Sequence, residues 1–271
     1  MPEALEVELT RQAIGVLVGR RFGAVERTDP LVVGDGVDVA VPGCSVESVG
    51  RRGKLLVVGT DGPTVGVHFG MTGRLFVDDG PAIDRLAYGA GGDDRVWDRW
   101  VVGLDDGSQL RLHDPRRLGR VWLEPAVGTL GPDVLTLTVS QLTTALARRR
   151  APLKAVLLDQ RAVAGLGNML VDELLWRVGL DPHRVASSLD VAEVRRLQAA
   201  VRRRLPVMLR RGGSHTGTLS PVVRAAGGPC PRCGELLRRD TVGGRTTIWC
   251  PGHQRWTCDD RRLVTTPPAL R

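Results

Sequence analysis

The spacing of apolar residues divides the chain into a helical start, a β-rich middle and a second helical region. In residues 2–18 apolar positions recur at helical intervals and acids occupy the first turns, which predicts an N-terminal helix. From about residue 23 to residue 123, short apolar runs broken by Gly, Pro and Asp are typical of strands. The expected strands are residues 54–59, 64–69, 97–104 and 109–112, with a hairpin turn at Asp106-Gly107. The pattern predicts a mainly β domain, which we interpret as a two-sheet sandwich.

A helical period returns from about residue 135 onward. The last expected helix has the clearest signals, because Asp190 and Glu193 form a capping-box pattern ahead of an apolar stripe. Pro206 is expected to kink this helix, and the Gly-, Ser- and Thr-rich residues 212–229 are expected to end it and to serve as a linker. The expected helices are residues 139–150, 152–160, 168–178 and 190–211.

Composition and charge narrow the class of protein. The chain has 271 residues, of which 42% are hydrophobic and 25% charged, as in ordinary globular proteins. No apolar run is long enough to span a membrane and the N-terminus is not signal-like, so a soluble cytoplasmic protein without a membrane partner is expected. Residues 1–144 carry 15 basic and 20 acidic side chains, whereas residues 145–271 carry 23 and 10. This basic excess indicates a polyanionic partner, although a solvated basic surface is the simpler alternative.

Four of the five cysteines lie in the last 42 residues, which indicates a metal site rather than a disulfide framework. Cys230 and Cys233 form one ligand pair, and Cys250 and His253 form a second after sixteen intervening residues. Two such pairs on tight turns can bind one structural Zn²⁺ ion tetrahedrally. His253 has the right spacing for the fourth ligand, but Cys258 lies close enough to compete. With a predicted hairpin between the pairs, the pattern predicts a β-ribbon zinc finger, which implies nucleic acid but not catalysis.

These patterns predict an α+β fold in four parts. The parts are an N-terminal helix and β-sandwich (1–128), a helical domain (135–222), a zinc finger (226–256) and a C-terminal tail (257–271). Disorder is the default expectation for the tail. Zinc binding would stabilise the finger, whose apolar core is small.

A set of ordered motifs carries a resemblance to a known family. Together they resemble the formamidopyrimidine-DNA glycosylase and endonuclease VIII family, over residues 2 to about 256. The family fold, a β-sandwich, a helix-two-turn-helix domain and a zinc ribbon, agrees with the pattern above. No motif suffices alone, since Pro-Glu also starts helices well. The motifs are Pro2-Glu3-Ala4-Leu5-Glu6, Arg51-Arg52-Gly53-Lys54, His68-Phe69-Gly70-Met71, Asp114-Pro115-Arg116-Arg117-Leu118-Gly119, Gly165-Leu166-Gly167-Asn168 and the finger with Arg245.

The resemblance implies a base-excision repair glycosylase with AP lyase activity that acts on damaged double-stranded DNA. Removal of the initiator Met would leave Pro2 with a free secondary amine, which attacks the sugar C1′, expels the damaged base and forms a Schiff base. Elimination then cuts the strand. The resemblance makes Glu3 the general acid/base and places Lys54 on the phosphate next to the lesion. A solvated charge at a strand end is the simpler interpretation of Lys54.

The same resemblance assigns contacts with DNA. Asn168 and Arg245 would pinch the phosphates that flank the lesion, and Asn168 could also serve as a helix N-cap. Lys154 matches another DNA-contacting position. Glu6, which by default lies on a helix face, gains a place in the pocket for the damaged base.

Extrusion of the damaged nucleotide leaves a space in the duplex. The resemblance implies that Met71, Arg116 and Leu118 fill this space, although Met71 by itself would be interpreted as a core residue. Family members of the formamidopyrimidine type commonly carry Phe where Leu118 stands, so the substitution removes an aromatic stack.

The segment from Gly212 to Cys230 is shorter than in the formamidopyrimidine branch, where a loop closes over oxidised purines. Residues 157–160 and 175–176 look more like the endonuclease VIII branch. Oxidised pyrimidines and abasic sites are therefore expected as substrates in preference to 8-oxoguanine.

Two other classes of protein remain open at this point. A non-catalytic damaged-DNA-binding protein with the same fold would bind DNA without a covalent intermediate. A zinc-ribbon protein that binds RNA would explain the basic half and the finger but not Pro2 and Glu3. A monomer is expected, since it suits an enzyme that slides along duplex DNA.

Overall fold

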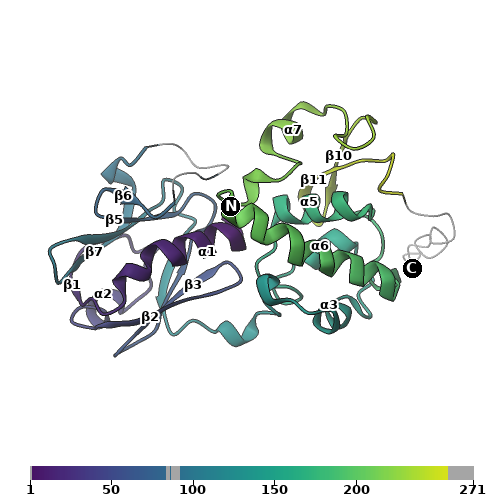
Figure 1. The fold of residues 1–271 in the computed structure, drawn as a ribbon. Coiled ribbons are helices and arrows are strands. Elements are labelled where there is room, and N and C mark those ends of the chain that lie inside the picture. Colours follow the sequence, from purple (N-terminus) through teal and green to yellow (C-terminus); the bar gives the residue numbers. More distant parts are fainter. Residues whose placement is uncertain (1, 84–85, 87–91, 256–271) are drawn as a thin grey trace, which may run out of the picture.

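The computed structural model describes residues 2–83, 86 and 92–255, and the chain forms two halves of different composition (Figure 1). Strands make up the N-terminal half, while helices and a C-terminal hairpin make up the other. Helix α1 (Ala4–Ala13) begins at the junction between the halves. The α+β class expected from the sequence is confirmed. The predicted tail and Cys258 lie outside the described residues.

The N-terminal half is a sandwich of two antiparallel sheets, with strand orders β1-β7-β8-β5-β6 and β2-β3-β4-β9. The predicted strands correspond to β3, β4, β7 and β8. The mostly exposed β1 and the mostly half-buried β2 lack the strict alternation of buried and exposed positions that sequence patterns detect. The strands are β1 (Phe22–Thr28), β2 (Val46–Arg52), β3 (Leu55–Thr60), β4 (Val65–His68), β5 (Arg74–Val77), β6 (Gly80–Pro81), β7 (Asp98–Leu104), β8 (Gln109–His113) and β9 (Arg120–Leu123).

The second half is helical, as predicted; one large apolar core joins its helices, and a smaller cluster around Trp176 joins α5 to the C-terminal hairpin. Helix α5 has the predicted bounds, whereas α3 ends earlier than expected, since Ala147 has a non-helical ψ of 138° and Arg148, which follows it, a left-handed φ of 60°. The helices are α3 (Val139–Leu146), α4 (Leu153–Leu158), α5 (Asn168–Val178), α6 (Val191–Arg210) and α7 (Pro221–Ala226). The shorter elements of both halves are α2 (Val37–Ala40), η1 (Ile14–Leu17), η2 (Arg95–Trp97), η3 (Val127–Thr129), η4 (Val134–Thr136), η5 (Ala186–Ser188) and η6 (Ser214–Thr216).

The capping box predicted for α6 is present. Asp190 accepts a hydrogen bond from the amide of Glu193 at 2.7 Å, and the Glu193 carboxylate accepts one from the amide of Asp190 at 2.9 Å. The helix continues through Pro206, and two glycines at positive φ follow its end. Satisfied N-terminal amides and an apolar stripe explain why this segment forms a long helix.

Helix α1 contributes to the cores of both halves. Ala4 and Leu5, at its start, are buried in the helical core. Val7, in the same helix, and Ile14 and Leu17, in η1, are buried in the sandwich core. One amphipathic segment therefore joins the two halves and holds the first residues of the chain at their junction (Figure 1).

Residues 212–229 are not the plain linker that we predicted from their composition. They contain η6 and α7, and the amide of Leu219 donates to the buried carboxylate of Glu173 at 2.9 Å. The segment leads to the hairpin of β10 (Arg238–Val242) and β11 (Arg245–Trp249), which packs on α5. Within the described ranges, no helix has the length and apolarity needed to cross a bilayer.

Candidate active site

A pocket of about 490 Å³ is lined by residues of the sandwich, the helical half and the C-terminal hairpin. It brings together six side chains that were predicted as site residues from separate stretches of sequence. The lining residues are Glu3, Lys54, Gly70, Met71, Leu118, Leu158, Gly167, Asn168, Gly244, Arg245 and Thr246.

Glu3 places its carboxylate on the N-terminus of α5. Its Oε1 accepts a hydrogen bond from the amide of Met169 at 2.8 Å, and its Oε2 accepts from the amides of Gly167 at 2.8 Å and Leu170 at 3.1 Å. Free amides and the helix dipole make this terminus suited to a carboxylate. Position 167 has room only for glycine, since a Cβ there would lie 2.3 Å from Cδ of Glu3.

Burial dominates the protonation of Glu3 and Lys54, whose exposed fractions are 3% and 8%. Burial raises the pKa of the Glu3 carboxyl above its ordinary value, even though Lys54 and two helix amides act in the opposite direction. Burial likewise lowers the pKa of the Lys54 amine; Arg245 adds to this decrease, and Glu3 opposes it. Each group is therefore shifted towards its neutral form, a property common among acids and bases of active sites.

Pro2 is buried directly before Glu3, and Glu6 holds this turn of the chain. Oε2 of Glu6 accepts a hydrogen bond from the amide of Glu3 at 2.8 Å, and Oε1 accepts from the amide of Ser214 at 2.6 Å. Glu6 is 3% exposed and does not line the pocket. It ties the start of α1 to the segment that follows α6, where Gly213 leaves room for its carboxylate.

The turn that carries Lys54 is anchored across the junction of the two halves. Arg51 donates two hydrogen bonds of 2.7 Å to the carboxylate of Asp133, which also accepts from the amide of Gly53 at 2.7 Å. Burial would raise the pKa of Asp133, but Arg51 and the amides of Gly53 and Leu135 together hold that pKa below its ordinary value. This bidentate pair fixes the turn between β2 and β3 against η4.

Two sandwich loops present the side chains predicted to fill the space of an extruded nucleotide. Met71 is 36% exposed and Leu118 is 46% exposed, so Met71 is not the core residue that its type alone suggests. Nη1 of Arg116 lies 3.6 Å from Sδ of Met71. The three side chains form one cluster, of which Met71 and Leu118 line the pocket.

Asp114 joins these two loops. It accepts hydrogen bonds from the hydroxyl of Thr72 at 2.5 Å, and from the amides of Leu118 at 2.7 Å and Gly119 at 2.6 Å. The loops also touch directly, because a Cβ on Gly70 would lie 2.2 Å from the carbonyl oxygen of Leu118.

Asn168 and Arg245 lie on different elements and both line the pocket. Gly167, and not Asn168, is the N-cap of α5, so Asn168 is its first helical residue. Oδ1 of Asn168 is buried and has no partner among the described residues, which leaves this atom available to a ligand. Arg245 is exposed at the start of β11.

Lys154 does not have the surface position that a DNA contact requires. Its side chain is fully buried, and Nζ donates to Oδ1 of Asp172 at 2.7 Å and to the carbonyl of Thr246 at 2.9 Å. Asp172 also accepts from the amide of Ile248 at 3.0 Å. Because a buried ammonium needs a partner, this lysine holds the hairpin that carries Arg245 instead of facing solvent.

The four predicted metal ligands converge. The donor atoms of Cys230, Cys233, Cys250 and His253 lie within 4.8 Å of one another. Cys233 Sγ lies 3.4 Å from Cys250 Sγ and 3.7 Å from Nδ1 of His253. Bond lengths to tetrahedral zinc imply edges of about 3.8 Å between sulfurs and about 3.6 Å from sulfur to nitrogen. The cluster therefore could hold a metal ion, with His253 as its fourth described ligand.

Helix α5 orients the histidine of this cluster. Nε2 of His253 lies 3.0 Å from the carbonyl of Trp176, a bond that places the proton on Nε2 and leaves Nδ1 free to bind a metal. The indole of Trp176 donates to Sγ of Cys230 at 3.3 Å.

Three supporting residues were not predicted from the sequence. Asp114 and His68 lie inside motifs that we quoted without giving them a role, and Asp133 lies outside every motif. His68 accepts from the amide of Gly70 at 3.2 Å, and burial next to Lys54 lowers its pKa. The contacts that reveal the roles of Asp114 and Asp133 join distant parts of the chain, since Asp114 accepts from Thr72 and Asp133 from Arg51, so no local pattern distinguishes these two residues.

Comparison with known proteins gives consistent matches along the chain. Residues 1–121 match the formamidopyrimidine-DNA glycosylase N-terminal domain, and residues 130–220 match the formamidopyrimidine-DNA glycosylase H2TH domain. Formamidopyrimidine-DNA glycosylases of Xanthomonas oryzae pv. oryzae and Laribacter hongkongensis are 34% and 35% identical; the matches cover 94% of this chain and 100% of each relative.

Solved structures show the same fold. The MutM (Fpg) protein of Thermus thermophilus matches with a TM-score of 0.75 and 31% identity, over 93% of this chain and 98% of that one. Lactococcus lactis Fpg in complex with abasic-site DNA matches with a TM-score of 0.79 and 24% identity, over 94% and 100%.

A β-sandwich, an H2TH domain and a Cys/His finger around a buried carboxylate define the chain as a DNA glycosylase of base excision repair. It belongs to the formamidopyrimidine-DNA glycosylase family.

Proposed function

We propose that the protein removes oxidised bases by attack of the Pro2 amine on the sugar C1′ and then cuts the strand by elimination. The observation that carries this proposal is the buried carboxylate of Glu3, held on the amides of α5 directly after Pro2. Removal of Met1 would free an amine whose ordinary pKa is about 8. A useful fraction of that amine is unprotonated, and therefore nucleophilic, near neutral pH.

Bonds and protons balance across the proposed steps. The nitrogen of Pro2 forms a bond to C1′ as the glycosidic bond breaks, and the departing base takes up the proton that the amine loses. Glu3 then protonates the sugar ring oxygen, the bond between C1′ and that oxygen breaks, and the opened sugar is left as an iminium, which acidifies the hydrogens on C2′. Removal of one of them breaks the C3′–oxygen bond and releases the 3′ phosphate. The raised pKa of Glu3 suits the acid role, because it keeps the carboxyl protonated closer to neutral pH.

We further propose that Asn168, Arg245 and Lys54 contact the phosphates around the lesion. All three line the pocket, and each can donate hydrogen bonds to phosphate oxygens, Asn168 through its side-chain NH₂ group. Met71, Arg116 and Leu118 would enter the duplex and fill the space of the extruded nucleotide. One zinc ion on the Cys/His cluster would hold the finger that presents Arg245.

Oxidised pyrimidines and abasic sites are proposed as better substrates than 8-oxoguanine. In place of a long free loop, residues 212–229 contain η6 and α7 and are anchored on Glu173. Structural neighbours were solved with DNA that contains an abasic site, Fapy-dG or an oxidised pyrimidine, so the fold accepts several lesions. Since the proposed partner is genomic double-stranded DNA, we place the protein in the bacterial cytoplasm as a monomer.

Borohydride trapping tests the amine mechanism. The chain is made with a tag fused directly to Pro2 through a protease site, so that the same preparation is assayed before and after the tag is removed. Duplexes carry an abasic site, 5-hydroxyuracil, formamidopyrimidine-guanine or 8-oxoguanine. We expect a covalent protein–DNA adduct only after cleavage, and faster trapping on the first two lesions than on 8-oxoguanine.

The results also separate the rival function. Trapping by the tagged protein would refute the amine mechanism. Duplex binding with no adduct in any sample, including the cleaved one, would indicate a non-catalytic damage-binding protein of the same fold.

A further inference from the structure

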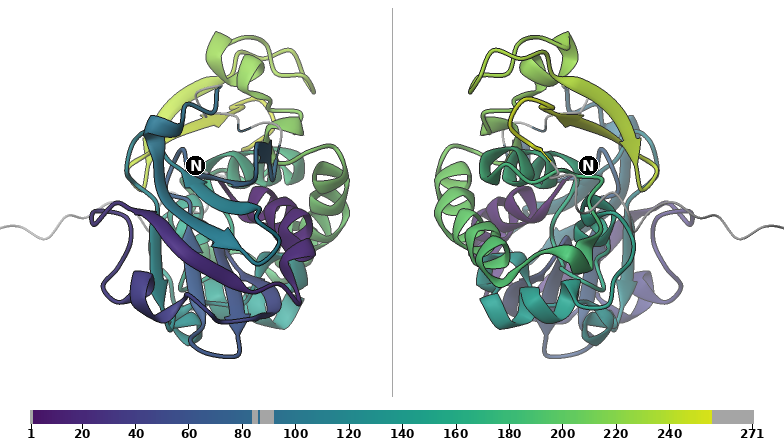
Figure 2. Two further views of the ribbon diagram at one scale, coloured as in Figure 1. Left: turned by 90° about the vertical axis from the view of Figure 1, so that its left-hand side faces the viewer. Right: turned by 90° about the vertical axis from the view of Figure 1, so that its right-hand side faces the viewer.

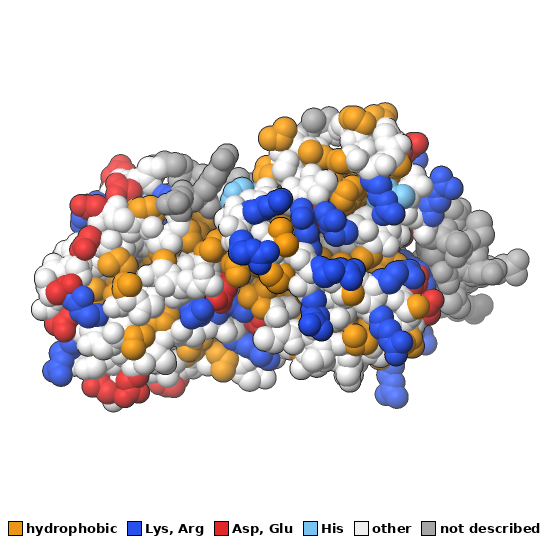
Figure 3. Space-filling model, viewed as in Figure 1, with side chains coloured by type: hydrophobic (Ala, Val, Ile, Leu, Met, Phe, Trp, Pro, Cys, Tyr) orange, Lys and Arg blue, Asp and Glu red, His pale blue; other side chains and the backbone are white. Residues whose placement is uncertain are grey.

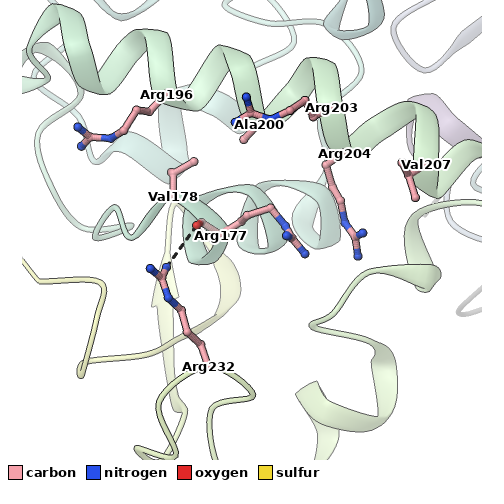
Figure 4. Close-up of a pocket in the computed structure, with 8 residues that line it drawn as sticks. All are labelled: Arg177, Val178, Arg196, Ala200, Arg203, Arg204, Val207 and Arg232. Atoms are coloured by element: carbon pink, nitrogen blue, oxygen red, sulfur yellow. Dashed lines mark hydrogen bonds between the residues drawn. The ribbon is translucent and has the colours of Figure 1, made fainter.

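A second concave surface lies away from the active site. This arginine groove, with a volume of about 550 Å³, runs between α6 and the end of α5 and is closed at one side by the finger. Its charged lining consists of Arg196, Arg203 and Arg204 on α6, Arg177 on α5 and Arg232 between two metal ligands (Figure 4). Cationic side chains gather on this face of the helical half, whereas acidic ones are seen mainly on the sandwich (Figure 3).

The groove has fewer carboxylates than guanidinium groups. Buried Glu173 is shared by Arg177 at 3.3 Å and Arg204 at 3.2 Å. Arg203 and Arg232 form no ion pair with any described residue. The fifth arginine, Arg196, is 3.9 Å from Glu193, a carboxylate already paired with Arg184 at 2.5 Å. Net positive charge held in a concave surface favours an anionic occupant.

The groove is separated from the active-site pocket by the length of α5. Asn168, at the first turn of that helix, lines the pocket, while Arg177 and Val178, at its last turn, line the groove. Nine residues of helix span about 14 Å. Helix α6 packs on one side of α5 and β11 on another (Figures 1 and 2). A ligand in the groove therefore does not occupy the pocket.

The spacing of the arginines favours a phosphodiester backbone over a compact anion. Arg196 and Arg203 are seven residues apart on one helix face, and Arg210 continues the row beyond the groove. Seven helical residues rise about 10 Å, which equals the rise along the duplex axis of about three phosphates of one DNA strand, at 3.4 Å each. Guanidinium groups bind phosphate oxygens in bidentate geometry.

We propose that the arginine groove binds the backbone of a second DNA segment while the pocket holds the first. Two segments on one chain would allow the enzyme to pass from one duplex to another without release into solution. This site is distinct from the contacts proposed for Asn168 and Arg245, and it is independent of the chemistry proposed for Pro2.

The stoichiometry of the full-length protein with undamaged 15-base-pair duplex tests the groove. The test variant is Arg196→Gln with Arg203→Gln. The matched control is Arg195→Gln with Arg202→Gln, which removes two exposed charges from the same helix outside the groove. Native mass spectrometry and sedimentation count the duplexes bound across a range of salt concentrations, and strand cutting of a damaged duplex reports on the pocket.

We expect two duplexes on the wild type and the control but one on the groove variant, with strand cutting of a damaged duplex unchanged. At the lowest salt concentrations, where the weakened second binding step of the groove variant can still be measured, its slope of log K against log salt should be smaller than that of the wild type by about two units, at about 0.9 per phosphate contact. An equal loss in both variants would refute the groove as a site, as would a wild type that binds a single duplex. Binding of a poly-glutamate peptide that depends on Arg196 and Arg203, without a second duplex, would overturn the proposal in favour of an acidic protein partner.

Discussion

Replacing Gly167 by Ala separates the position of the Glu3 carboxylate from its chemistry. The backbone at Gly167 has φ −129° and ψ −169°, which alanine adopts without strain. The added Cβ, however, would lie 2.3 Å from Cδ of Glu3. Carbon atoms in contact need about 3.5 Å, so the carboxylate has to retreat by about 1 Å from the amides of α5.

This displacement gives two expected magnitudes. A misplacement of about 1 Å costs on the order of 10²-fold in rate. Weakening one or two of the three hydrogen bonds to the carboxylate should cost about 1–3 kcal/mol in the free energy of unfolding. In a protein of this size, that corresponds to a fall in Tm of roughly 3–9 °C.

Single-turnover base release, measured well below the Tm of the variant, checks the rate, and calorimetry checks the stability. Gly15→Ala is the matched control, since a Cβ at Gly15 meets nothing within 4 Å. Binding of undamaged duplex should stay within about twofold of wild type, because Glu3 is too deeply buried to contribute to it. Base release by Gly167→Ala at the wild-type rate would refute a role for Glu3 at its observed position.

Three further substitutions test other parts of the geometry. Lys154→Met removes one partner of the buried Asp172 carboxylate and should cost about 3 kcal/mol in the free energy of unfolding. The dependence of DNA affinity on salt should stay unchanged. A salt slope lower by about one would mean that this lysine contacts a phosphate. His253→Ala should lose the bound metal ion and DNA affinity together, whereas His253→Cys should keep both. Metal analysis and fluorescence anisotropy measure these two properties. Metal retained in the alanine variant would exclude the histidine as a ligand. The hydrogen bond with Asp181 raises the pKa of His183, so this pair stabilises the fold by at most about 1 kcal/mol, since it is partly exposed. That stabilisation is complete below the ordinary pKa near 6.5 and is lost as the pH rises through the raised pKa. The Tm difference between wild type and His183→Gln should therefore shrink from pH 6 to pH 8, and a constant difference would contradict this.

Local signals predicted the parts of the fold that depend on local physics. The capping box of α6 and the end of α5 at Val178 depend on near neighbours in the chain, and both are confirmed. Exposed strands such as β1 have no periodic apolar face, so they escaped prediction. The composition of residues 212–229 suggested a linker, but packing against Glu173 organises them into η6 and α7.

The site could be predicted only as a set of residues, and not as an arrangement. Glu3 and Gly167 are 164 positions apart, and no pattern along the chain shows that a carboxylate from one end caps a helix near the other. Lys154 illustrates the opposite error, because a positive charge near a DNA-binding motif suggests a phosphate contact until its burial against Asp172 is seen. Sequence motifs identify candidate functional residues, whereas the burial and the partners of each side chain determine whether it can contact DNA.

Helix α5 links the Glu3 carboxylate at its first turn with the metal-binding finger at its last turn. This link suggests how bound DNA would set the protonation of Glu3 and Lys54. The first turn of α5 holds the carboxylate of Glu3, and Trp176 in its last turn orients the finger that carries Arg245. A phosphate arriving beside Asn168 adds negative charge next to two groups that burial has already shifted towards their neutral forms. Like charge raises the pKa of Glu3 further, while opposite charge restores the pKa of Lys54. DNA itself would therefore leave the acid protonated and the lysine charged, the state that the proposed proton donation by Glu3 and the proposed phosphate contact of Lys54 require.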